Sequence, residues 1–215
     1  CMEPDKFFPC TQIDIVQFPD GLGGNSIIEN TFKGPIHQQL REALQFIKNS
    51  IITKKIVKSA DKAEADWVYN YPYAAVEEAL ANALAHANYY GRRGILVVKK
   101  GKKLSISNPG TIRVTKEEFY AGGNSDPRNP NILKMFGFVN VGERAGSGVD
   151  KIMTAWAEQN WKKPEFDFSE RSDRVTLKLE VGQVVYIPGA ADIRNENTNQ
   201  EKATAVSKED KILEY

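Results

Sequence analysis

Residues 71–90 read YPYAAVEEALANALAHANYY, and this stretch decides most of what the sequence predicts about the fold. Its apolar residues recur at intervals of three and four: Val76, Leu80, Ala83, Leu84 and Ala87. That interval is the repeat of one helix face, so the pattern predicts a helix with a buried stripe. Pro72 stands at its start, where the missing N–H of proline costs nothing.

Three polar residues of the same helix are also spaced by four, Glu78, Asn82 and His86. This spacing stacks them on one face, beside the apolar stripe, at the rim of a core or in a cleft. Asn82 offers an oxygen of the kind that Mg²⁺ binds, and Glu78 can polarise a water for attack on a phosphoryl group. The alternative is a solvated polar face, with His86 as a hydrogen-bonded histidine rather than a metal ligand.

Segments on both sides of this helix predict a mixed sheet. Strands are expected at 11–18, 67–69, 94–98, 104–107, 165–168 and 174–181, and further helices at 35–58, 130–136 and 147–160. Hairpins rather than strict strand–helix–strand alternation connect them. The predicted fold class is therefore α+β, with a mixed, mostly antiparallel sheet and helices on one face.

Three loops carry residues suited to ligand binding. They are SNPG at 107–110, SDPRNP at 125–130 and GERAGSGV at 142–149. Gly110 permits close backbone approach, and Arg128 suits a phosphate or carboxylate. Gly146, Ser147 and Gly148 stand at the N-terminus of a predicted helix, as in anion-binding loops. The alternatives are an ordinary turn, an arginine in a structural salt bridge and a plain glycine loop.

Composition narrows the function classes. The 215 residues hold 29 basic and 28 acidic side chains, so the net charge of +1 excludes nucleic-acid binding through overall charge. One basic run (Arg92, Arg93, Lys99, Lys100, Lys102 and Lys103) could touch nucleic acid or simply protect a hairpin edge. No apolar run predicts a membrane span or leader, and two cysteines make no disulfide framework. A cytoplasmic protein is expected.

The segments EALANALAHANYY, SNPG, SDPRNP and GERAGSGVDKI, in this order, resemble the GHKL-type ATPase module of RecG-related transcriptional regulators. The resemblance covers about residues 66–181. It implies a GHKL-like α/β sandwich of the histidine-kinase and gyrase type. In that family a Schlafen-type AlbA-like domain precedes the module and a winged helix-turn-helix follows it.

The same resemblance implies a domain division. Residues 1–30 would be the C-terminal tail of an AlbA-like domain, 31–189 the ATPase module, and 190–215 a linker and the start of a winged helix. For residues 1–30, an added edge strand on the same sheet is an equally open alternative.

The resemblance also assigns roles. Glu78 matches a general base, Asn82 a magnesium ligand and His86 the end of the same motif. Asn108 stands where the superfamily has the aspartate that binds the adenine amino group, and Gly110 at its first glycine. A second glycine box takes in Gly146, Ser147 and Gly148, and Arg128 joins the nucleotide-binding set. Asn108 departs from the pattern, since an amide oxygen accepts more weakly than a carboxylate.

The expected function is an ATP-binding regulatory module, with Mg²⁺, in a DNA-binding transcriptional regulator. DNA would be contacted through flanking domains, and a homodimer is expected. Two alternatives stay open: an active Mg-dependent ATPase linked to DNA processing, and a nucleotide-free dimerisation or scaffold domain. The sequence has no P-loop, which argues against a helicase motor.

Overall fold

The computed structural model describes residues 8, 10–18, 27–51, 54–58, 65–69, 73–123, 125–138, 148–169 and 173–181. These residues lie within one compact unit, Cys1–Gln183. The predicted linker and winged-helix start at 190–215 lie outside the described residues, as do Gly146 and Ser147.

A six-stranded sheet runs through this unit in the order β2-β1-β5-β6-β8-β7. The strands are β1 (Ile13–Phe18), β2 (Ile28–Phe32), β5 (Ile95–Lys100), β6 (Lys103–Pro109), β7 (Glu165–Ser169) and β8 (Arg174–Glu180). Only the neighbours β1 and β5 run parallel; the other four pairs are antiparallel. The predicted mixed, mostly antiparallel sheet is thereby confirmed.

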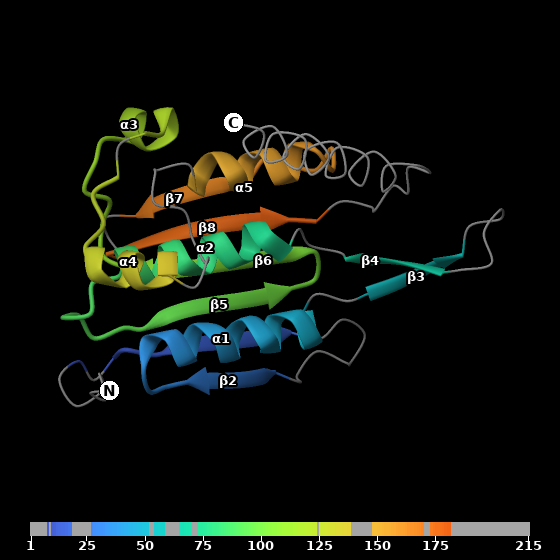
Figure 1. Ribbon diagram of the computed structural model, residues 1–215, viewed down its shortest axis with the longest axis horizontal. Helices are drawn as coiled ribbons and strands as arrows, with labels where there is room; N and C mark the ends of the chain where they lie inside the picture. Colours follow the sequence, from blue (N-terminus) through green and yellow to red (C-terminus); the bar gives the residue numbers. More distant parts are fainter. Residues whose placement is uncertain are drawn as a thin grey trace, which may run out of the picture. The chain divides into compact units, whose positions relative to one another are not determined.

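Three helices cover one face of the sheet, namely α1 (Ile36–Phe46), α2 (Tyr73–His86) and α5 (Gly148–Ala157) (Figure 1). Alternate strand residues point toward them and are buried, including Ile13, Ile15, Ile95, Val97, Leu104, Ile106, Leu177 and Leu179. This period of two is that of strands with one face in a core. The sheet and the helical layer make the α+β fold that the sequence predicts.

Two shorter helices, α3 (Lys116–Ala121) and α4 (Pro130–Phe138), lie between β6 and α5 in the chain. The core fixes α5 through Trp156, which is fully buried and donates from Nε1 to the Glu180 carbonyl at 3.0 Å. The C-terminal end of α5 is thus tied to β8.

The helix predicted over 35–58 is wrong in its second half. α1 ends at Phe46, a π-helical turn follows (Ile47–Ile51), and residues 54–58 form strand β3 (Lys54–Lys58). β3 pairs with β4 (Ala65–Tyr69) as an antiparallel hairpin. Residues 51–58 read IITKKIVK, and their β-branched side chains favour a strand where the helical apolar stripe ends.

The N-terminal strand is an internal part of the sheet. β1 lies between β2 and β5, and the buried Gln39 donates to the Thr11 carbonyl at 2.8 Å just before it. Residues 13–32 therefore contribute two strands to this sheet. The alternative of an added strand fits this stretch, although β1 is not the edge.

None of the helices among the described residues has both the length and the apolar character that crossing a membrane requires.

Candidate functional site

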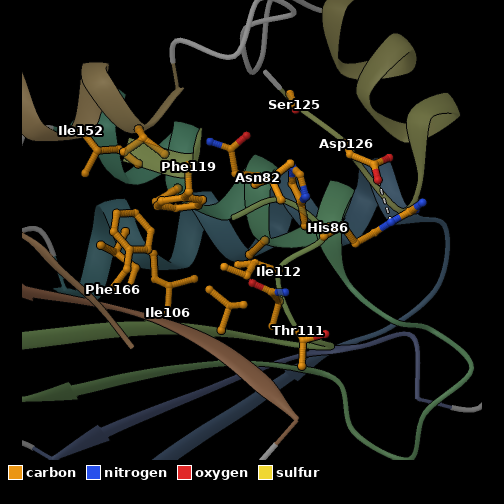
Figure 2. A pocket seen from close by; sticks show the side chains of 18 residues that line it. Asn82, His86, Ile106, Thr111, Ile112, Phe119, Ser125, Asp126, Ile152 and Phe166 are labelled. Atoms are coloured by element: carbon orange, nitrogen blue, oxygen red, sulfur yellow. Dashed lines mark ion pairs between the residues drawn. The ribbon is translucent and has the colours of Figure 1, made fainter. Parts of the chain in front are cut away.

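α2 forms one wall of a cavity of about 120 Å³ between the helical layer and the sheet. Its alanines let it pack closely on both sides, so most of the helix is buried, including the predicted stripe. Asn82 and His86 point from it into the cavity (Figure 2). The prediction that the polar face borders a cleft rather than bulk solvent is confirmed for these two residues.

The other walls come from segments far apart in the sequence. They supply Ile106 and Asn108 of β6, Ile112, Phe119 of α3, Ser125 and Asp126, Val149 and Ile152 of α5, Phe166 of β7, and Val175 and Leu177 of β8. The lining is mainly apolar with a few polar groups, as in sites for small organic ligands.

Glu78 and Asn82 meet the start of α5 at one end of this site. Asn82 Nδ2 donates to Glu78 Oε1 at 3.1 Å, and Glu78 is 1% exposed. A Cβ built on Gly148 would lie 2.5 Å from Asn82 Nδ2 and 2.6 Å from Glu78 Oε1. A larger residue there would force one of these two side chains to move, so the structure brings Glu78, Asn82 and Gly148 together, as the resemblance implied.

Lys151 also faces this end, one turn into α5. Its Nζ lies 3.6 Å from Glu78 Oε2. Burial raises the pKa of the neighbouring Glu77 carboxyl, and the Lys151 ammonium opposes that rise. One cation thus serves two carboxyl groups on α2.

Asn108 lines the cavity from near the end of β6. It is almost fully buried, and its Nδ2 donates to the Pro109 carbonyl at 3.3 Å. This bond leaves Oδ1 as the acceptor on that side chain. An acceptor in an apolar cavity selects a ligand with an N–H or O–H donor at this point.

Gly110 makes the turn after β6 at a φ of +95°, a conformation that favours glycine. Its backbone N–H donates to the Asp173 carbonyl, and the Pro109 carbonyl accepts from the Asn88 backbone N–H. The turn is therefore tied both to β8 and to the residues just after α2. Gly110 shapes this wall but does not line the cavity.

Arg128 lies on this turn and outside the cavity lining. Its Nη2 donates to the Thr111 carbonyl at 2.7 Å, and its Nε would lie 2.7 Å from a Cβ on Gly110. Within the part of the chain that the structure describes, its partner is a backbone carbonyl rather than the carboxylate of a salt bridge. Burial lowers the pKa of the His86 imidazole, and the Arg128 cation lowers it further. The ring is neutral at pH 7.

Asn129 fastens the same loop to the end of α2. Its Nδ2 donates to the carbonyls of Ala85 at 3.1 Å and Ala87 at 2.8 Å, and its backbone N–H donates to Ala85 at 2.9 Å. The last carbonyls of a helix have no N–H partner within the helix, so Asn129 acts as a cap at the end of α2.

Sequence reasoning missed the aromatic wall. Phe119 of α3 packs edge-on against Phe166 and Phe168, with centroids 4.8 and 5.0 Å apart. A signal for α3 was present, since Thr115 and Glu118 form a capping box. Nothing local showed that Phe119 would reach the cavity.

The basic run is divided between the two ends of β5. Arg92 and Arg93 precede the strand, and Lys99 to Lys103 surround the hairpin turn beyond it. Six strand residues span about 20 Å, so the run is not one patch.

The residues present fit a nucleotide with a divalent cation. The cavity is below the roughly 300 Å³ that encloses a drug-sized ligand, but it suits a base-sized group. Asn82 donates through Nδ2 to Glu78, so its Oδ1 is available to a hard cation. Among the described residues no three acidic, histidine or cysteine side chains cluster as a metal site, so phosphate and water would complete the coordination.

Comparisons with known proteins agree with this fold. Residues 98–179 match a family described as "Putative ATP-dependent DNA helicase recG C-terminal". The crystal structure of the DIP2311 protein from Corynebacterium diphtheriae superposes with a TM-score of 0.65 at 20% identity, over 83% of this chain and 35% of that one. No curated protein matches.

Residues 98–179 are thus similar to a RecG-related ATPase-like family, and the α+β fold of the described residues fits a GHKL-like fold. The chain spans about a third of the solved relative's length. The matched range includes Asn108 and Gly148 and begins after α2. The family match therefore does not include Asn82. Its contact with Gly148 is what links it to the matched residues.

Proposed function

We propose that this chain is a nucleotide-binding regulatory module that takes ATP and Mg²⁺ in the cavity beside α2. One observation carries the proposal: Asn82, which lies against Gly148, and Asn108 line one cavity from α2 and from β6. The site thus offers an oxygen for a cation, a helix start for phosphates and an acceptor for a base. The match to an ATPase-like family supports the same ligand class.

The base would enter between Asn108 and the apolar walls. Asn108 Oδ1 would accept from the amino group of adenine, and Ile106, Ile112 and Phe166 would contact the ring. Guanine carries a carbonyl where adenine carries that amino group. Two facing acceptors repel, so the site favours adenine.

The phosphates would lie toward the start of α5, where the helix dipole favours negative charge. Asn82 Oδ1 would bind Mg²⁺, which then keeps phosphate and water ligands. Gly146 and Ser147, which lie outside the described residues, are proposed members of the same phosphate-binding loop. His86 would border the site as a neutral ring, and Arg128 would contribute positive potential from the Gly110 turn.

Thermal unfolding with and without nucleotides tests the proposal. Saturating Mg-ATP at about 100 times Kd should stabilise the chain by about 2.7 kcal/mol, and Mg-GTP much less. Asn82→Ala should abolish the shift, whereas Asn131→Ala, which removes an exposed amide on α4, should keep it. If Mg-ATP gives no shift with the unaltered chain, the scaffold alternative replaces this proposal.

Hydrolysis is a second candidate function, favoured by the contact of buried Glu78 with Asn82. Glu78 would orient a water toward the terminal phosphate. Phosphate release that disappears in Glu78→Gln while nucleotide binding persists would establish the ATPase. Binding with no release by the unaltered chain would leave the regulatory function alone.

We also propose that the whole protein is a cytoplasmic, homodimeric DNA-binding transcriptional regulator. The net charge of +1 supports DNA contact by flanking domains rather than by this module. Nucleotide would act by binding one conformation of the whole protein more tightly than another. DNA affinity of the full-length protein that is unchanged by Mg-ATP would contradict this coupling.

A further inference from the structure

The carboxylate of Glu78 occupies an unusual electrostatic position. It is 1% exposed, and removing a charge from water to this extent costs several kcal/mol unless partners compensate. Its two oxygens face different groups. Oε1 accepts from Asn82 Nδ2 at 3.1 Å, and Oε2 lies 3.6 Å from Lys151 Nζ. An ammonium therefore stands where a cation is needed.

Lys151 is held at this place by α5. Gly148, one turn earlier, abuts Glu78 Oε1 and Asn82 Nδ2, so that a Cβ there would come within 2.6 Å of both atoms. The Lys151 side chain is 38% exposed and has a flexible four-carbon stem. The ammonium can reach Glu78 or turn outward to the opening of the site.

A divalent cation and the ammonium compete for the same carboxylate. Two positive charges a few ångströms apart repel strongly in a partly buried site. Mg²⁺ on Asn82 Oδ1 would approach Glu78, because Asn82 and Glu78 are hydrogen-bonded. Lys151 must then leave, and the nearest new negative charge would be the phosphates at the start of α5.

We propose that Lys151 is a positioning residue. Its ammonium group occupies the cation position beside Glu78, and it moves to the phosphates when metal and nucleotide bind. This inference rests on the proposed function. In the ligand-free chain, the Lys151 ammonium thereby balances the negative charge of the buried Glu78 carboxylate. It also makes binding of the metal alone weaker than binding of the metal with a triphosphate.

Opposite effects of one substitution test this role. Lys151→Gln should tighten binding of Mn²⁺ alone about tenfold, and weaken binding of a non-hydrolysable ATP analogue with Mg²⁺ about tenfold, each equivalent to about 1.4 kcal/mol. Calorimetric titration of the 215-residue chain measures both. Lys151→Arg, which keeps the charge, should retain the analogue affinity. Lys134→Gln, an exposed charge on α4, should change neither affinity.

A second measurement needs no variant and covers the case in which Lys151→Gln does not fold. Reaction of Lys151 with an amine-selective reagent, followed by mass spectrometry, should become faster with Mn²⁺ alone and slower with the Mg–analogue complex. Lys134 should react at a constant rate.

Each outcome decides a separate claim. Equal effects of Lys151→Gln on both titrations, or no effect on either, would overturn the role of Lys151. A labelling rate that Mn²⁺ leaves unchanged would overturn it as well. Failure of the unaltered chain to bind the analogue would contradict the proposed nucleotide function, whereas the Mn²⁺ results would still decide whether Lys151 holds a cation position.

Discussion

Two of the helices that line the cavity, α2 and α3, are held in opposite ways. Most of α2 is buried between α1, α5 and the sheet, whereas none of the six residues of α3 is buried. α3 touches the rest of the site mainly through Phe119. One wall is thus part of the core, and the other rests on an aromatic cluster.

This difference teaches where the site is rigid. A group that must bind a metal and phosphates needs fixed geometry, and α2 with the start of α5 supplies it. Segments with few buried contacts open at low free-energy cost. The wall that α3 forms can therefore adapt to the ligand, and substitutions on the two sides should have different consequences.

The largest effect is expected at Gly148, on the rigid side. Gly148→Val should lower the free energy of unfolding by about 3 kcal/mol, because the new side chain collides with Asn82 and Glu78 in a packed site. Urea unfolding measures the change. Gly91→Ala is the matched control, since its Cβ would meet only the Asn88 carbonyl at 3.4 Å. Equal stability of the two variants would contradict a rigid α2–α5 contact.

The cap of α2 should give the next effect. Asn129→Ala removes donors from the carbonyls of Ala85 and Ala87, and should cost about 2 kcal/mol. Asn131→Ala, at an exposed position two residues later, should change stability by less than about 0.5 kcal/mol. Amide hydrogen exchange at the end of α2 should become faster only in Asn129→Ala. Unchanged exchange there would show that this side does not depend on the cap.

The contrast between the helices also explains what the sequence could predict. The stripe of α2 and the stacking of Glu78 on Asn82 follow from local spacing, and the structure confirms both. The contact of Asn82 with Gly148 joins residues far apart in the chain, and no periodicity reports it. The family resemblance placed both in one site, and the structure supplies the contact.

Other features lay beyond local patterns. The caps that Asn129 gives to α2 and the reach of Phe119 into the cavity depend on tertiary packing. The helix over 35–58 was predicted too long, since it was extended past the end of its apolar stripe into residues that pair as β3. The β-branched residues there favour a strand.

On the adaptable side, Phe119→Ala should cost only about 1 kcal/mol of stability, since the ring is partly exposed and contributes mainly its aromatic contacts. It should nevertheless change ligand access, because Phe119 lines the cavity. Association rates of a fluorescent adenine nucleotide should rise in this variant. Glu117→Ala, at an exposed position of the same helix that does not line the cavity, is the control and should leave the rate unchanged. A slower rate in Phe119→Ala would show that the ring helps to bind the base.

The smallest effect is expected from the cap of α3 itself. Thr115 accepts from the Glu118 backbone N–H at 3.1 Å, and Glu118 accepts from the Thr115 backbone N–H at 2.9 Å. An N-cap in a cooperative structure contributes about 1 kcal/mol. α3 has no buried residue, so it can unfold locally before the core does, and much of that contribution is lost from global stability. Thr115→Ala should therefore change the global free energy by about 0.5 kcal/mol or less, while amide exchange in α3 becomes several-fold faster. A global loss as large as that of Asn129→Ala would mean that α3 unfolds together with the core, and the distinction between the two walls would fail.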